Sequence, residues 1–170
     1  MRWQETNTLI SANESGTLVG HDVRSGEVCW SYETPSATGR VCALGSLTKD
    51  GDEMVLGHDT GHVSIFSVRK TGLVMSSKVH EDEVRGLAVN GGGGRREGTT
   101  IVSTCSDGTC AVSLRAEGGG EASALRCVAR LKGHDNKGLC VTLVSAVDDT
   151  FISSAADGRV LLWSPPWRSN

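Results

Sequence analysis

The sequence is poor in aromatic residues, in prolines and in long apolar runs. Of its 170 residues, 4% are aromatic and three are proline. No apolar stretch approaches the roughly 18 residues that a membrane-spanning helix needs, and no segment keeps a helical apolar period over three turns. The chain instead has 22 glycines and short apolar runs. This composition favours short strands joined by frequent turns, so we predict an all-β fold.

The charge and the cysteines exclude several classes of function. The formal net charge is −3, and Lys and Arg form no dense cluster, so we expect no nucleic-acid partner. The sequence has six cysteines, but no two of them form a Cys-x-x-Cys pair, and no Cys and His residues are spaced as in zinc sites. We therefore predict reduced thiols, no metal and no cofactor. The N-terminal MRWQETN lacks a signal-peptide pattern, which predicts no membrane association and a cytoplasmic location, with the nucleus as the alternative.

The stretch 151–163, FISSAADGRVLLW, organises the rest of the chain. Its two apolar runs flank an Asp-Gly pair, which is typical of a β-hairpin. Aligning the chain on this turn gives four positions that are each followed by glycine: Ser15, Thr60, Asp107 and Asp157. Their spacings of 45, 47 and 50 residues match the period of one four-stranded propeller blade.

The residues around these turns resemble the signature of the WD-repeat (WD40) β-propeller family. That signature is a Gly-His pair, a Ser or Thr, a turn Asp and a closing Trp-Asp dipeptide. The fourth repeat carries it as His134, Ser153, Asp157 and Trp163, with Ser164 in place of the final acidic residue. The third repeat keeps His80, Ser103 and Asp107 and has Ser113 at the Trp position.

The other two repeats depart further from the signature. In the second, no His precedes the repeat, and the Ser, Asp and Trp positions hold Leu56, Thr60 and Phe66. The first has Ser11, Ser15 and His21. The resemblance implies that the tetrad is structural: Asp accepts from His, His reaches Ser, and Ser accepts from the indole N–H, which joins three strands. It also implies that His134, Ser153 and Asp157 are not a hydrolytic triad.

The resemblance assigns residues 1–170 to one partial propeller that contains four repeats. The repeats are expected at about 1–33, 34–78, 79–131 and 132–164, with a tail at 165–170. Residues 1–5 are expected to be the tail of an inner strand. The other expected strands are 8–12, 17–23, 27–33, 40–46, 53–58, 62–68, 73–78, 84–89, 99–105, 109–114, 124–131, 139–145, 150–154 and 159–163.

Four blades are fewer than the ring of about seven that the resemblance implies. The fourth repeat also has no outer strand, because Pro165 and Pro166 end its last strand. Three explanations remain open at this point. The chain is a fragment, an N-terminally truncated gene product, or half of a ring that another chain completes.

The family resemblance implies a non-catalytic scaffold or adaptor that binds protein partners through loops on one rim. We predict that this rim holds the loops after each outer strand and the turns between the two middle strands. A compact acidic group on it is suited to a basic peptide. The candidate partner-binding residues are Glu14, Asp59, Glu81, Asp82, Glu83, Arg85 and Lys137.

Two alternatives give the chain a more specific role. Asp22-Val23-Arg24, with Arg69 at the equivalent place in the next repeat, resembles the Trp-Asp-x-Arg signature of substrate receptors of cullin-RING ubiquitin ligases. The second alternative is a metal-dependent hydrolase that uses His58, Asp59 and His62, which are close in sequence around one turn.

Overall fold

The computed structural model describes residues 7–13, 15–48, 51–90, 98–115, 125–145 and 148–164. In these residues it contains strands and turns and no helix long and apolar enough to cross a membrane. The strands agree with the predicted spans to within one residue at every end. They are β1 (Thr8–Ala12), β2 (Thr17–Asp22), β3 (Val28–Glu33), β4 (Val41–Ser46), β5 (Glu53–His58), β6 (His62–Ser67), β7 (Gly72–Lys78), β8 (Val84–Asn90), β9 (Thr99–Cys105), β10 (Thr109–Arg115), β11 (Leu125–Lys132), β12 (Gly138–Ser145), β13 (Thr150–Ala155) and β14 (Val160–Trp163).

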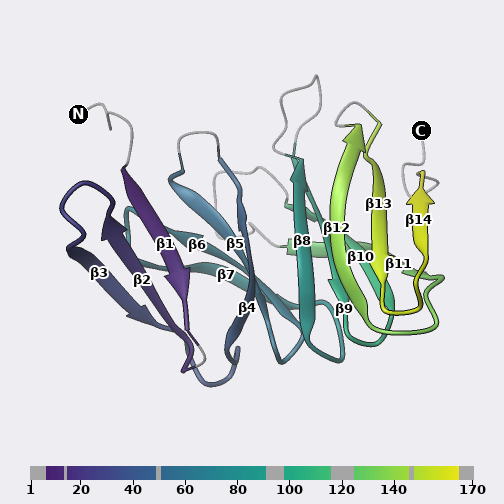
Figure 1. The fold of residues 1–170 in the computed structure, drawn as a ribbon, viewed down its shortest axis with the longest axis horizontal. Helices are drawn as coiled ribbons and strands as arrows, with labels where there is room; N and C mark the ends of the chain where they lie inside the picture. Colours follow the sequence, from purple (N-terminus) through teal and green to yellow (C-terminus); the bar gives the residue numbers. More distant parts are fainter. Residues whose placement is uncertain are drawn as a thin grey trace.

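The strands form four antiparallel sheets, which confirms the predicted all-β class. The sheets follow one another along the long axis of the molecule in chain order, with the first and the fourth at opposite ends (Figure 1). The first sheet is β1-β2-β3, the second β4-β5-β6-β7, the third β8-β9-β10-β11 and the fourth β12-β13-β14. In the described residues the fourth sheet has three strands. The inner strand expected at 1–5 lies outside the described residues.

Each pair of neighbouring sheets encloses its own apolar core. Leu18 of the first sheet packs with Leu56 and Phe66 of the second. Between the second and third sheets the core includes Val63, Ile65, Val84 and Ile101, and between the third and fourth it includes Val102, Val112, Val141 and Phe151. Because side chains alternate along a strand, each of the two middle sheets has one set of side chains in each core. The sheets thus stack face to face.

Glycines at the turns between the middle strands have the left-handed backbone that the repeat alignment requires. Gly16, Gly61, Gly108 and Gly158 have φ between 77° and 87°, a region that residues with a Cβ seldom adopt. At Gly61 a Cβ would also lie 2.1 Å from the carbonyl oxygen of His80. This close approach joins the β5–β6 turn to the loop after β7.

Candidate functional site

The fourth sheet contains a four-residue hydrogen-bond chain. The Trp163 indole Nε1 donates to the Ser153 hydroxyl at 2.8 Å, and His134 Nε2 lies 2.8 Å from the same hydroxyl. His134 Nδ1 lies 3.1 Å from Asp157 Oδ2. His134 and Ser153 are buried. The chain satisfies each buried polar group and links the loop before β12 to β13 and β14, which is the arrangement expected of a structural tetrad.

Asp157 is also held by groups outside the tetrad. Its carboxylate accepts from the backbone N–H of Asp135 and from the backbone and side chain of Arg159. Burial by itself raises the pKa of Asp157, but the hydrogen bonds from the Arg159 and Asp135 backbone, His134 and the Arg159 side chain outweigh it and lower the pKa. The carboxylate is therefore ionised at neutral pH and fully used as an acceptor.

The third sheet has a similar hydrogen-bond chain, in which one more residue, Thr109, lies between the histidine and the aspartate. His80 Nε2 lies 2.8 Å from the Ser103 hydroxyl, but Nδ1 lies 3.2 Å from the hydroxyl of Thr109. Thr109 in turn donates its hydroxyl to Asp107 at 2.7 Å. The direct His-to-Asp hydrogen bond expected from the signature is thus replaced by a bridge through Thr109. At the Trp position, Ser113 is buried, and among the described residues its hydroxyl has no hydrogen-bond partner.

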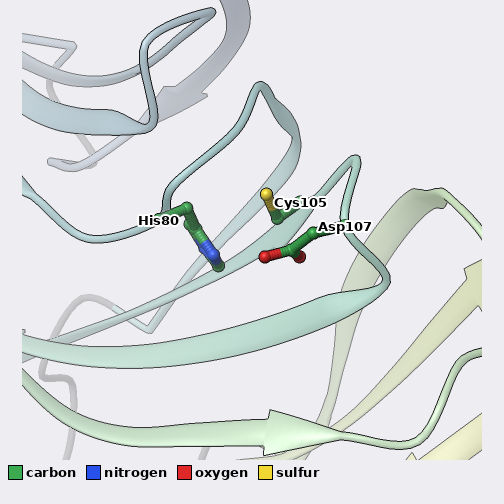
Figure 2. A group of neighbouring side chains, drawn as sticks. All are labelled: His80, Cys105 and Asp107. Carbon is green, nitrogen blue, oxygen red and sulfur yellow. The ribbon is translucent and has the colours of Figure 1, made fainter.

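His80, Cys105 and Asp107 form a group whose potential ligand atoms lie within 4.8 Å of one another (Figure 2). Burial lowers the pKa of His80 to about 4 and raises the pKa of the Cys105 thiol to about 12, so both are neutral near pH 7. Both ring nitrogens of His80 already face hydroxyl groups. A metal ion would have to displace these contacts and a thiol proton, so the group fits a hydrogen-bonded structural cluster better.

The second sheet has a His–Ser pair that the sequence comparison missed. His58, at the end of β5, is fully buried. Its Nε2 lies 2.9 Å from the Ser64 hydroxyl, its Nδ1 lies 3.2 Å from the Gly39 carbonyl oxygen, and Ser64 reaches the hydroxyl of Ser76 at 2.8 Å. The histidine comes from a strand instead of the loop before the sheet. A search at the signature's spacing cannot find it.

The three residues proposed as ligands of a metal-dependent hydrolase, His58, Asp59 and His62, each contact a different partner. His58 faces Ser64 in the core. Asp59 accepts from Arg40 Nε at 2.8 Å, and His62 Nδ1 lies 2.9 Å from the Thr60 hydroxyl. Burial lowers the pKa of both histidines. His58, Asp59 and His62 are therefore not brought together as a ligand set.

Solved structures with this arrangement of sheets include two WD40 proteins and a computationally designed protein. A structure of U3-55K matches with a TM-score of 0.71 and 21% identity, over 96% of this chain and 47% of that chain. The WD40 repeats of RRP9 match with a TM-score of 0.72 and 22% identity, over 96% of this chain and 46% of that chain. The chain has the WD40 β-propeller fold.

The WD40 matches are about twice as long as this chain, which spans just under half of each. The computationally designed Ika4 protein also matches, with a TM-score of 0.70 and 20% identity, over 95% of this chain and 87% of that one. No protein-family model and no curated protein sequence matches the chain. The family resemblance inferred from the turn residues is thus confirmed at the level of the fold.

The predicted partner-binding loops of this WD40 fold lie on one rim, which we call the turn rim. It consists of residues 34–40, 59–61, 79–83, 106–108, 133–137 and 156–159, at the lower edge of Figure 1. Backbone hydrogen bonds join each turn to the preceding loop: Asp59 N to Arg40 O, Ser106 N to Glu83 O, and Ala156 N to Lys137 O. These bonds hold Asp59, Glu83 and Lys137 on a fixed backbone. Glu14 lies outside the described residues.

Several charged groups of the turn rim are paired. Asp59 pairs with Arg40, and Glu83 accepts from Arg85 at 3.1 Å. The exposed Glu81 lies 3.8 Å from Lys78 Nζ, a loose contact. Asp82 uses one carboxylate oxygen to accept from the Glu83 backbone N–H at 2.7 Å. Glu81 and Asp82 are therefore the acidic residues of the group 81–83 with the weakest ties to cations in the described structure.

Arg24 and Arg69 lie in equivalent turns, between β2 and β3 and between β6 and β7. The Arg24 turn is closed by Asp22, whose carboxylate accepts from the Arg24 backbone N–H at 2.7 Å. Arg69 forms an ion pair with Asp52. The proposed ligase-adaptor residues thus occupy matching positions, but the guanidinium of Arg69 is already engaged within the second sheet.

A buried carboxylate between the third and fourth sheets was not anticipated from the sequence. Asp149 accepts from Asn90 Nδ2 at 2.6 Å and from the Thr100 hydroxyl at 3.1 Å. It is almost fully buried and has a φ of 54°. Asp and Asn tolerate this left-handed conformation better than most residues, but its partners are about 50 residues or more away in sequence, so no local pattern reveals the contact.

Proposed function

We propose that the chain is a non-catalytic scaffold or adaptor that binds a protein partner through the turn rim. The observation that carries the proposal is that the His, Ser and Asp groups suggestive of catalysis are used inside the sheets, as in the chain from Asp157 to Trp163. The rim loops around them have a backbone fixed by hydrogen bonds. A rigid scaffold with exposed side chains on its loops is suited to binding.

The acidic group 81–83 indicates the chemistry of the partner. Glu81 is exposed, and its contact with Lys78 at 3.8 Å is too long for a strong ion pair. The Ser106 backbone N–H donates to the Glu83 carbonyl oxygen, so the loop backbone that carries these carboxylates needs little ordering when a partner binds. We infer that this part of the rim receives a basic peptide segment.

Charge reversal on the rim tests this role. The double variant Glu81→Lys and Asp82→Lys is compared with Glu27→Lys, which reverses an exposed acidic residue on a turn between β2 and β3. Affinity capture from cells should lose rim-dependent partners in the double variant and retain them in the control. An unchanged partner set, or no stable partner of the wild type, argues against the proposal.

Other parts of the proposal follow from the composition. The net charge of −3 does not favour a nucleic-acid partner. All six cysteines are free thiols, which supports a reducing compartment, the cytoplasm or the nucleus. Absence of RNA binding at low salt is the expected outcome of a filter-binding assay.

The second candidate function is a substrate receptor of a cullin-RING ubiquitin ligase. It is favoured by the matching positions of Arg24 and Arg69 in successive turns. Reversing both charges should abolish association with the ligase adaptor if the two arginines contact it. Unchanged association removes them from consideration and leaves the general scaffold role in place.

A further inference from the structure

The two end sheets each have one face with no neighbouring sheet in the described structure (Figure 1). We call the face that each sheet turns toward the next sheet in the chain its leading face, and the opposite face its trailing face. The leading face of the fourth sheet and the trailing face of the first are the two end faces. Register places Thr142, Ile152 and Leu162 in one row of the fourth sheet's leading face, and Ser154 and Val160 in the next.

The fourth sheet's leading face has the side chains of a core but is exposed. Counted from the turn residue of each repeat, Val160 is equivalent to Leu18, Val63 and Cys110, and these three have 0% exposure. Val160 is 66% exposed. Leu162 is equivalent to Ile65 and Val112, and it is 65% exposed where they have 0%. The positions that bury each of the first three sheets against the next are thus apolar and uncovered in the fourth.

The trailing face of the first sheet shows the same contrast. Leu9 is equivalent to Met54, Ile101 and Phe151 of the other sheets. Ile101 and Phe151 are at most 1% exposed, while Leu9 is 60% exposed. Leu9 is followed across the sheet by His21 and then Val28, which is also largely exposed. This face therefore offers two largely exposed apolar side chains, one on each side of His21, to a neighbouring sheet.

The fourth sheet also lacks the protection usual at a free sheet edge. β12, β13 and β14 contain no Asp, Glu, Lys or Arg, and in the described residues β14 pairs with β13 alone. Natural edge strands are commonly guarded by charged side chains, and large exposed apolar patches mark interaction surfaces. Without charged side chains on these three strands, the exposed Val160 and Leu162 form part of an apolar surface of the kind that a neighbouring sheet covers.

We propose that a second copy of this chain covers both end faces, the leading face of the fourth sheet in each copy packing on the trailing face of the first sheet in the other. One chain provides both halves of the contact, and three internal interfaces already join leading to trailing faces in this way. Two copies supply eight sheets, the upper end of the roughly four to eight blades of closed propellers. The ring has two-fold symmetry and leaves no open end.

The mass of the 170-residue chain in solution is the first test. Light scattering coupled to size exclusion should give twice the 17.9 kDa chain mass. A monomer at every concentration overturns the proposal and leaves the end faces to another protein. A mass of three or more copies overturns it as well. This readout does not involve the turn rim, so it stands or falls separately from the proposed scaffold function.

Variants of the two faces test which surfaces meet. Leu162→Arg and Leu9→Asp each place a charge in both interfaces of the pair, and each should give a monomer. Val74→Asp is the control, because Val74 is an exposed apolar residue of β7 in the second sheet, away from both end faces. It should remain a dimer. A dimer that survives both face variants overturns the proposal.

Mixing the two face variants distinguishes a broken interface from a misfolded chain. A pair of Leu9→Asp with Leu162→Arg has one unaltered interface and one in which Asp faces Arg, so the equimolar mixture should recover a dimer. Failure to recover it while both variants remain folded by circular dichroism contradicts the predicted pairing. If either variant unfolds, Leu162→Ala and Leu9→Ala replace them, and each should weaken dimerisation by about tenfold or more. An unchanged dissociation constant in both overturns the proposal.

Discussion

The indole of Trp163 donates to the Ser153 hydroxyl at 2.8 Å in the fourth sheet, whereas Ser113, at the equivalent place in the third, has no hydrogen-bond partner among the described residues. The two sheets share a His–Ser contact of 2.8 Å. They differ in how the hydrogen-bond chain ends: the fourth sheet has the indole N–H donor of Trp163 at this place, and the third sheet has Ser113 instead. Ser113 is therefore a buried hydroxyl outside the hydrogen-bond chain and Ser153 a buried hydroxyl at its centre, and comparing their removal measures what the tetrad contributes to stability.

Replacing Ser113 by alanine should leave stability unchanged or raise it by about 1 kcal/mol, because it removes a buried hydroxyl without a partner. Ser153→Ala should instead lower stability by about 1–3 kcal/mol, because it leaves the buried indole N–H and His134 without their shared partner. Urea unfolding of both variants measures the difference. Equal losses in the two would contradict the assignment of Ser113 as unsatisfied.

Stability should fall as the pH drops from about 6.5 toward 4, because burial lowers the pKa of His80 and also of His58 and His62. Burial lowers the pKa of His80 to about 4 in the folded chain, below its ordinary value of 6.5. Between these values the unfolded chain binds the proton and the folded chain does not, so acid favours unfolding. Urea midpoints measured across this range check the slope. His80→Gln should flatten it, and an equally steep slope in that variant would assign the effect to other groups.

Gly61→Ala should be markedly more destabilising than Gly158→Ala. Both glycines have positive φ, but a Cβ at Gly61 meets the His80 carbonyl oxygen at 2.1 Å, while nothing described lies within 4 Å of one at Gly158. We expect a loss of about 1 kcal/mol at Gly158 from the backbone conformation alone, and more than twice that at Gly61. Thermal and urea unfolding measure both. Similar losses would mean that the β5–β6 turn moves to accept the methyl group.

Phe66→Ala should lower stability by about 3–5 kcal/mol, since it removes a large, fully buried side chain. The Phe66 ring lies with its centroid 5.6 Å from that of Trp30 and 5.2 Å from that of Tyr32. The loss therefore falls on the core between the first and second sheets. Val74→Ala, on an exposed part of β7, should change stability by about 0.5 kcal/mol or less. A small loss at Phe66 would show that this core collapses around the cavity.

Much of the fold follows from local features of the sequence. The Asp-Gly and related turns, as at Asp157 and Gly158, require a left-handed glycine, and the short alternating runs between them have no other regular structure to adopt. The period of the turns then fixes the number of sheets. The tetrad of the fourth sheet was found at the signature's spacing because its four members occupy regular positions on loop, strand, turn and strand.

Only the tertiary structure decided how the other polar groups are satisfied. His58 takes the place of a missing loop histidine from within β5, Thr109 bridges His80 to Asp107, and Asp149 joins two sheets. These contacts depend on which side chains meet when sheets stack, and stacking brings together residues far apart in sequence. For the same reason, the sequence shows that Val160 and Leu162 are apolar, but only the arrangement of the sheets shows that these two side chains are exposed.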